Sequence, residues 1–131
     1  MVECTMFYVL IFSLAAVLLI VAGVTTMSRR RRSMRAEVLW IDHFGNVQLA
    51  ATTVDTQMAE LPGRVDVTVE LDVPNPPPGL VVRRVETFDE LAPGELGLMT
   101  DANGHLAVVA GQASAARALT VIAGQMVLLT W

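Results

Sequence analysis

The stretch from Arg64 to Val73 alternates strictly between apolar and polar residues. Valines and a leucine occupy positions 65, 67, 69, 71 and 73, and charged residues or a threonine occupy the positions between them. Because side chains on a strand point alternately to opposite faces, this period of two predicts a strand with one buried and one solvated face. Such strands are typical of an antiparallel sheet or a small barrel.

Six other short apolar runs have the length of strands; they cover residues 37–41, 47–51, 80–88, 95–99, 105–110 and 125–130. Proline and glycine residues separate them, as turns require. In particular, Asn103-Gly104 lies between two apolar runs and predicts a tight hairpin. Seven strands in this space leave little room for helices, so we expect a mainly β fold, a small antiparallel β-barrel.

One short helix is expected in the alanine-rich stretch 111–119, where Ser114 can act as the N-cap. A second stretch, from Asp55 to Leu61, carries a weaker helical signal. The predicted domain is therefore a barrel with one short helix.

The amino-terminal part of the chain has a different pattern. Residues 6–27 are apolar almost throughout, and no charged residue stands between Glu3 and Arg29. At about 1.5 Å per residue such a helix spans about 30 Å, the thickness of the hydrocarbon core of a bilayer. We therefore expect a short tail (1–5), a transmembrane helix (6–27), a basic juxtamembrane linker (28–36) and the β domain (37–131).

Five arginines follow the apolar run, whereas Glu3 alone precedes it. The positive-inside rule then places the carboxyl-terminal domain in the cytoplasm, tethered to the cell membrane by a single span. A cleaved signal peptide would instead need basic residues before the apolar run and a small-residue cleavage site after it. The arginine cluster has two interpretations, a stop-transfer signal or a site for anionic lipid.

The remaining charge is acidic. Residues 36–131 hold four arginines against twelve acidic residues, a formal charge of −8. An acidic domain repels the phosphate backbone, so nucleic acid is not an expected partner. Cys4 is the single cysteine, which excludes an intramolecular disulfide and a thiolate metal cluster.

The usual catalytic patterns are missing. His43 and His105 are not at metal-ligand spacing, and neither Ser33 nor Ser114 has a general base nearby in the sequence. The glycines do not form a phosphate-binding loop between a strand and a helix. From the residues we expect no catalytic residues, no metal and no cofactor.

The turn Asp42-His43-Phe44-Gly45-Asn46 is the strongest signal for a binding site. An asparagine amide can donate to N7 of adenine and accept from its N6 amino group, and an aromatic ring can stack on the base. Gly45 would let the backbone approach closely. The alternative is a hairpin loop in which Gly45 and Asn46 supply the turn and Phe44 packs onto the core.

A resemblance favours the binding interpretation. The pieces EVLWIDHFGNVQL, VETFDELAPGELGLMTDANGHLAVV, ASAARAL and GQMVLL, in this order, resemble the C-terminal domain of the S-adenosyl-L-methionine (SAM) hydroxide adenosyltransferase family. That family includes SAM hydrolases, fluorinase and chlorinase. The resemblance covers Glu37 to about Leu129 and implies a small antiparallel barrel, which supplies the adenine wall of a site completed by the N-terminal domain of a neighbouring subunit in a trimer.

The resemblance also implies roles for particular residues. Asn46 matches the asparagine that reads adenine, and Phe44 and Phe88 match the aromatic residues near the base. Ala102, Asn103 and Gly104 match the hairpin near the amino-acid end of the ligand. Ala115 and Ala116 stand where the family has an alanine pair at the start of a helix.

This chain departs from the family pattern in three places. Leu49 and Ala50 replace a threonine-asparagine pair, and the Ala102-Asn103 segment lacks the usual serine. The family's N-terminal domain, with its ribose-binding aspartate, has no counterpart, and the predicted transmembrane helix takes its place. The resemblance thus leaves enzymatic activity undecided, since it implies release of adenosine from SAM by attack of water, yet this chain supplies the adenine wall only.

Three functions follow from these observations. The first is a membrane-anchored domain that binds adenosine or SAM, is inactive alone, and completes its site with a separate N-terminal-domain protein or within a homotrimer. The second is a membrane-tethered protein-interaction module, with an open edge at Leu80 to Val85 or an apolar patch as its contact surface. The third is a remnant of a SAM hydrolase gene, in which residues 1–35 have no evolved role.

Overall fold

The computed structural model describes residues 9, 11, 13 and 30–131, and Val9, Ile11 and Ser13 are helical. The chain divides into two units, of which Arg31–Trp131 is the β domain. The predicted transmembrane helix (6–27) lies outside the described residues, apart from these three helical positions. Within the described part, no helix has both the length and the apolar character needed to cross a membrane.

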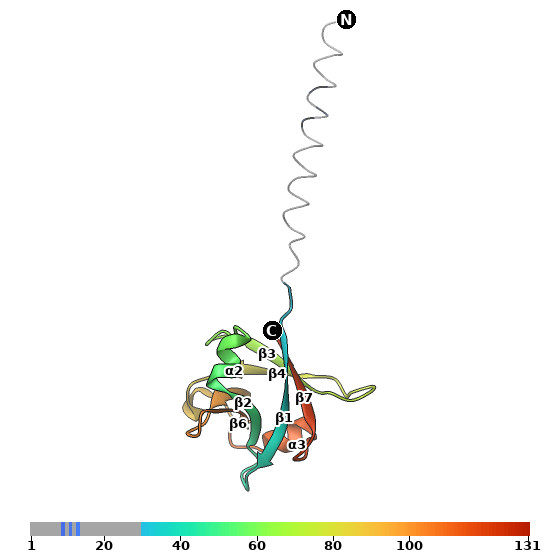
Figure 1. Cartoon of the computed structure of the whole chain (residues 1–131). Coiled ribbons are helices and arrows are strands. Elements are labelled where there is room, and N and C mark those ends of the chain that lie inside the picture. The colour runs from blue at the N-terminus through green and yellow to red at the C-terminus, as the bar shows by residue number, and fades with distance from the viewer. Residues whose placement is uncertain (1–8, 10, 12, 14–29) are drawn as a thin grey trace, which may run out of the picture. The chain divides into compact units, whose positions relative to one another are not determined.

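Seven strands close into a barrel in the order β1-β2-β6-β5-β4-β3-β7. Figure 1 shows β1 and β7, from the two ends of the domain, side by side. The bounds of the seven strands are β1 Ser33–Ile41, β2 Val47–Thr52, β3 Asp66–Leu71, β4 Leu80–Arg84, β5 Leu96–Thr100, β6 His105–Ala110 and β7 Met126–Thr130. Each corresponds to one of the seven predicted runs, so the mainly β barrel is confirmed. β1 starts four residues before the predicted run, because Ser33 pairs with Thr130 of β7.

The expectation of a wholly antiparallel barrel was wrong at one strand pair. β4 and β5 run parallel, with Arg83 opposite Gly97 and Arg84 opposite Leu98. Parallel neighbours need a crossover rather than a hairpin, and residues 85–95 provide it. The predicted 80–88 strand ends early because Phe88–Glu90 forms a short 3-10 helix, η1, in this crossover.

Pairing on both sides of β4 also removes the open edge that the sequence suggested at Leu80 to Val85. β3 pairs with residues 80–83 of β4, and β5 pairs with its last two residues. The barrel therefore offers no complete free edge there for strand addition.

The described β domain contains two short α-helices, where one was predicted. α3, Ala115–Leu119, lies in the expected stretch, and the hydroxyl of Ser114 accepts a hydrogen bond from the backbone N–H of Arg117. α2, Thr53–Met58, lies in the stretch with the weaker signal, starting two residues earlier. It forms because Thr52 and Asp55 make a reciprocal capping box.

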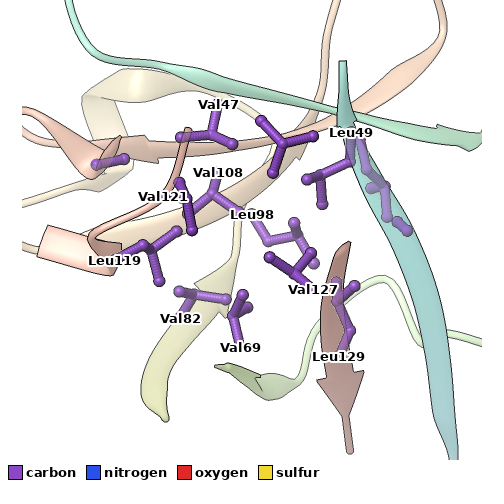
Figure 2. Packing of buried hydrophobic residues seen from close by; sticks show 14 of the residues in the cluster. Val47, Leu49, Val69, Val82, Leu98, Val108, Leu119, Val121, Val127 and Leu129 are labelled. Carbon is purple, nitrogen blue, oxygen red and sulfur yellow. The ribbon is translucent and has the colours of Figure 1, made fainter. Parts of the chain in front are cut away.

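The barrel interior is filled by small branched side chains. The alternating valines of β3, Val67 and Val69, point inward and are fully buried. Leu119 and Val121, at and after the end of α3, point into the same cluster as Val82 and Val108 (Figure 2). α3 therefore contributes to the core, which fixes the position of the residues at its amino-terminal end.

The crossover from β4 to β5 lies against the outside of the barrel. A Cβ at Gly97 would be 2.9 Å from both methyl carbons of Leu91, and one at Gly111 would be 2.2 Å from the carbonyl oxygen of Ala92. Val109 points away from the barrel core but is 1% exposed. These contacts outside the barrel core hold the crossover, residues 85–95, which carries Phe88.

Candidate functional site

The Asp42 carboxylate organises the turn between β1 and β2. Its Oδ1 accepts hydrogen bonds from the backbone N–H groups of Phe44 and Asn46, both at 2.9 Å. Gly45 closes the turn with a φ of +86°, a conformation that suits glycine. The sequence Asp-x-x-Gly therefore folds locally into a tight turn whose shape one acidic side chain holds.

The same turn is tied to the start of α3. The backbone carbonyl of Gly45 accepts a hydrogen bond from the N–H of Ala116 at 2.9 Å. A Cβ at Gly45 would lie 2.1 Å from the hydroxyl oxygen of Ser114, so only glycine fits here. The backbone N–H of Ala116 and the absence of a side chain at Gly45 thus allow these two segments to come into contact.

Asn46 has its amide orientation set by the same carboxylate. Its Nδ2 donates to Oδ2 of Asp42 at 2.8 Å. A carboxylate only accepts hydrogen bonds, so the amide nitrogen must face Asp42. The Oδ1 acceptor and the second N–H of Asn46 make no hydrogen bond within the part of the chain that the structure describes, which leaves the two groups that an adenine edge requires.

Phe44 and Phe88 are both outside the core, so the part of the loop interpretation in which Phe44 packs onto the core is wrong, although Gly45 and Asn46 do form the turn. The relative exposures of Phe44 and Phe88 are 69% and 49%. The ring of Phe44 is supported by that of His43, with centroids 4.0 Å apart and an angle of 38° between the planes. Exposed apolar surface rimmed by polar groups is a feature of interaction sites.

Two adjoining cavities share Asp42, Asn46 and Phe88, and we call them together the groove. The first, of about 290 Å³, is also lined by Trp40, Gln48, Met99, Thr100, Asp101, Ala102, Ala107 and Val109. The second, of about 610 Å³, is also lined by Phe44, Ala110, Gln112 and Ala113. Asn46 and Phe88 therefore meet at an open concavity, as the binding interpretation requires.

The turn between β5 and β6 repeats the arrangement of the first turn. Oδ1 of Asp101 accepts from the backbone N–H groups of Asn103 and His105, at 2.8 and 3.0 Å, and Gly104 has a φ of +79°. Oδ2 of Asp101 accepts from Nε2 of Gln48 on β2. This bond joins the second turn to the strand that follows the first turn.

The structure separates the residues predicted from this second turn. Ala102 lines the first cavity, whereas Asn103 and Gly104 line neither cavity. Asn103 is exposed, and the carbonyl of Gly104 accepts from the backbone N–H of Thr53. Asn103 and Gly104 thus shape the hairpin, and Ala102 alone of the three faces the groove.

Several groove residues were not predicted, namely Trp40, Gln48, Met99 and Asp101. A signal for Asp101 was present, since DHFGN and DANGH share the pattern Asp-x-x-Gly-x. Of the family departures, Leu49 is fully buried in the core, and neither it nor Ala50 lines a cavity. These two departures from the expected pattern therefore lie outside the groove.

The groove is negatively charged at neutral pH. Burial alone would raise the pKa of Asp42, but hydrogen bonds from Asn46 and Phe44 outweigh it and lower the pKa. At Asp101, burial is likewise outweighed by hydrogen bonds from Gln48, His105 and Asn103, which lower the pKa. No arginine or histidine lines either cavity, so the groove suits a neutral or cationic ligand.

The groove contains no evident metal centre. Among residues 9, 11, 13 and 30–131, no three side chains of histidine, cysteine, aspartate or glutamate come together in a way that could hold a metal ion. The arrangement offers hydrogen bonds, aromatic surface and negative charge, all of which serve binding.

Comparison with known proteins gives the following matches. Residues 36–128 match the family model described as SAM hydroxide adenosyltransferase C-terminal domain. A protein of Salinispora tropica named (R)-S-adenosyl-L-methionine hydrolase is 39% identical over 95 residues, which is 72% of this chain and 32% of that protein. A protein of the same name from Salinispora arenicola is 38% identical over the same shares. The chain thus spans about a third of the length of these curated relatives.

A solved structure matches the fold. A crystal structure of an uncharacterised conserved protein from Thermotoga maritima aligns with a TM-score of 0.66 and 21% identity, covering 74% of this chain and 35% of that one. The two proteins therefore share the fold of this region.

Proposed function

We propose, from the premise that the chain belongs to the SAM hydroxide adenosyltransferase family through its C-terminal domain, that its groove binds the adenosine part of SAM or adenosine itself. The observation that carries this proposal is the Asn46 amide, oriented by Asp42 at 2.8 Å and placed beside the exposed ring of Phe88. The curated relatives are hydrolases of SAM by name.

Asn46 reads the base in this account. Its free Oδ1 accepts from the N6 amino group of adenine, and its second N–H donates to N7. Phe44 and Phe88 offer flat apolar surface for the ring, and each such stacking contact is worth about 1 to 3 kcal/mol by analogy with nucleic-acid bases. The ionised carboxylates of Asp42 and Asp101 favour the sulfonium cation of SAM over an anionic ligand.

We propose that the barrel supplies one wall of a site and does not hydrolyse SAM by itself. Attack of water on the ribose 5′ carbon needs an oriented nucleophile in a site closed to bulk water, and the groove is open. A separate N-terminal-domain protein or neighbouring copies in a homotrimer would supply the other wall. We further propose that residues 6–27 tether the domain to the cytoplasmic face of the cell membrane.

The test is isothermal titration of the full-length protein, in non-ionic detergent, with adenosine and with SAM. We expect both ligands to bind, and Asn46→Ala to weaken binding at least tenfold, because it removes both contacts to the base. Asn103→Ala is the matched control, since this exposed asparagine lies in the equivalent turn but outside the groove, and it should bind as the wild type does. Absence of heat with either ligand at millimolar concentration would overturn the proposal.

The second function, a protein-interaction module, is favoured by the apolar rim of the groove. Trp40 is 59% exposed and Phe44 is 69% exposed, and both lie beside Asn46. Exposed aromatic residues are enriched in protein interfaces. A protein-interaction module that does not use adenosine would bind its partner equally well in the Asn46→Ala variant. If adenosine contributes to partner binding, that contribution should be lost in this variant.

A further inference from the structure

Three of the four arginines that follow residue 36 line one cavity, which shares no lining residue with the groove. Arg64, Arg83 and Arg84 line this space of about 300 Å³ together with Asp66 and Glu90. The cavity lies where β3 begins and β4 ends. Since β3 and β1 both pair antiparallel with β7 and start beside its end at Thr130, this is also the end of the barrel at which the chain enters from the juxtamembrane arginines.

Arg84 forms no ion pair within the described residues. Its side chain is half-buried, and its Nη1 is shielded from solvent without a hydrogen-bond partner in the described part of the chain. Its Nη2 makes a long contact of 3.4 Å with the hydroxyl of Thr100, and no carboxylate in the described residues forms an ion pair with it. Buried charges in proteins are normally paired, and this half-buried guanidinium has no carboxylate partner within the described residues.

The other charged groups of the cavity are mostly engaged. Arg83 forms an ion pair with Glu95 and donates to the backbone carbonyl of Glu90. The Glu90 carboxylate accepts from the backbone N–H groups of Glu86 and Thr87, at 2.6 and 3.0 Å. Arg64 is exposed and has no ion pair within residues 30–131. Arg64 and Arg84 therefore form no ion pair within the described residues, and the carboxylates that line the cavity with the three arginines are those of Asp66 and Glu90.

We propose that this cavity binds a phosphate group, with Arg64 and Arg84 as its main cationic contacts. Guanidinium groups present planar forks of N–H donors that match phosphate oxygens and hold their charge at neutral pH. The phosphate can come from an anionic phospholipid headgroup or from a free phosphate ion. The lipid source is favoured because the cavity lies at the end of the barrel where the chain enters β1. This part of the inference rests on the membrane tether proposed above.

The test measures thermal unfolding of the full-length protein in non-ionic detergent. Inorganic phosphate is compared with chloride at equal ionic strength, and a ligand that binds the folded state raises Tm. We expect phosphate to raise the Tm of the wild type by about 3 °C or more. The exposed Arg64→Gln change leaves the core intact and should abolish this rise, and Arg84→Gln should do the same if it folds.

Arg117→Gln is the matched control, because it removes the same charge from the exposed surface of α3. It should keep the full rise in Tm. A rise that persists in Arg64→Gln, or no rise in the wild type, overturns the proposal. Adenosine titration of Arg64→Gln should be unchanged, so failure of the phosphate site and failure of the adenosine site can be told apart.

A second arm identifies the source of the phosphate. A short-chain phosphatidic acid is added to the micelles and compared with the same amount of short-chain phosphatidylcholine. A further rise with phosphatidic acid that depends on Arg64 assigns the site to an anionic lipid headgroup. A response to inorganic phosphate without this further rise assigns it to free phosphate and overturns the lipid part of the inference.

Discussion

At the scale of single residues, Asp42 does most to shape the groove. Its two oxygens accept three hydrogen bonds from the turn, two from backbone N–H groups and one from the amide of Asn46. Hydrogen bonds to an ionised group are worth about 1.5 to 3 kcal/mol. The side chain thus links folding to function, because the charge that stabilises the turn also orients the amide that contacts the ligand.

This role predicts a dependence of stability on acid pH. The folded-state pKa of Asp42 lies below its ordinary value of 3.8. Its contribution is therefore complete above the unfolded pKa and is lost as the pH falls through the folded pKa. We expect the free energy of unfolding of Asp42→Asn to be lower than that of the wild type by about 1 to 3 kcal/mol at pH 7, since the charged acceptor is lost.

Denaturant unfolding of both proteins between pH 7 and pH 2 measures this effect. The difference between wild type and Asp42→Asn should shrink as the pH falls below about 4. A difference that stays constant through this range would show that the carboxylate charge does not stabilise the turn. Asp101 contributes in the same pH range in both proteins and so does not affect the comparison.

At the scale of elements, the crossover from β4 to β5 carries the aromatic wall of the groove. It lies on the outside of the barrel because two glycines, Gly97 and Gly111, leave room for Leu91 and Ala92. Backbone hydrogen bonds from Gly94 to Gly111 and from Gly111 to Glu95 hold it there, at 2.6 and 2.9 Å. The position of Phe88 therefore depends on close backbone contact.

Gly111→Ala tests this dependence. Its Cβ would lie 2.2 Å from the carbonyl oxygen of Ala92, so the crossover must move. We expect destabilisation of about 1 to 3 kcal/mol, as for other overpacked sites, and weaker adenosine binding because Phe88 is displaced. Gly63→Ala is the control, since its Cβ would meet nothing within 4 Å. Unfolding and titration of both variants decide the matter, and wild-type binding by Gly111→Ala would contradict this role of the crossover.

At the scale of the whole molecule, the sequence predicted the parts better than their arrangement. The alternation in residues 64–73 and the glycine and proline turns identified all seven strands, because strand faces and turns depend on local sequence. The parallel pairing of β4 and β5 was missed, since it depends on how residues 85–95 pack against distant glycines. The second helix was expected only weakly, as a six-residue helix depends mainly on its cap at Thr52.

The groove residues likewise include some that the sequence predicted and others that it did not. Phe44 and Asn46 were predicted because they lie together in one turn, and Phe88 came from the family resemblance. Trp40, Gln48 and Asp101 were missed, because the contact of Gln48 with Asp101 joins residues 53 positions apart in the chain. The family resemblance predicted that Asn103 contacts the ligand, but in the structure its turn leaves it exposed to solvent. The sequence pattern Asp-x-x-Gly predicts each turn separately. Only the closed barrel brings the turn after β1 and the turn after β5 to the same groove.

The most direct test of the adenosine site is an NMR titration of the isotopically labelled protein with adenosine. We predict that the side-chain amide signals of Asn46 and the backbone signals of Phe44 and Phe88 shift together along one binding curve, while those of Asn103 stay in place. Shifts confined to residues outside the groove, or none at saturating adenosine, would contradict the account.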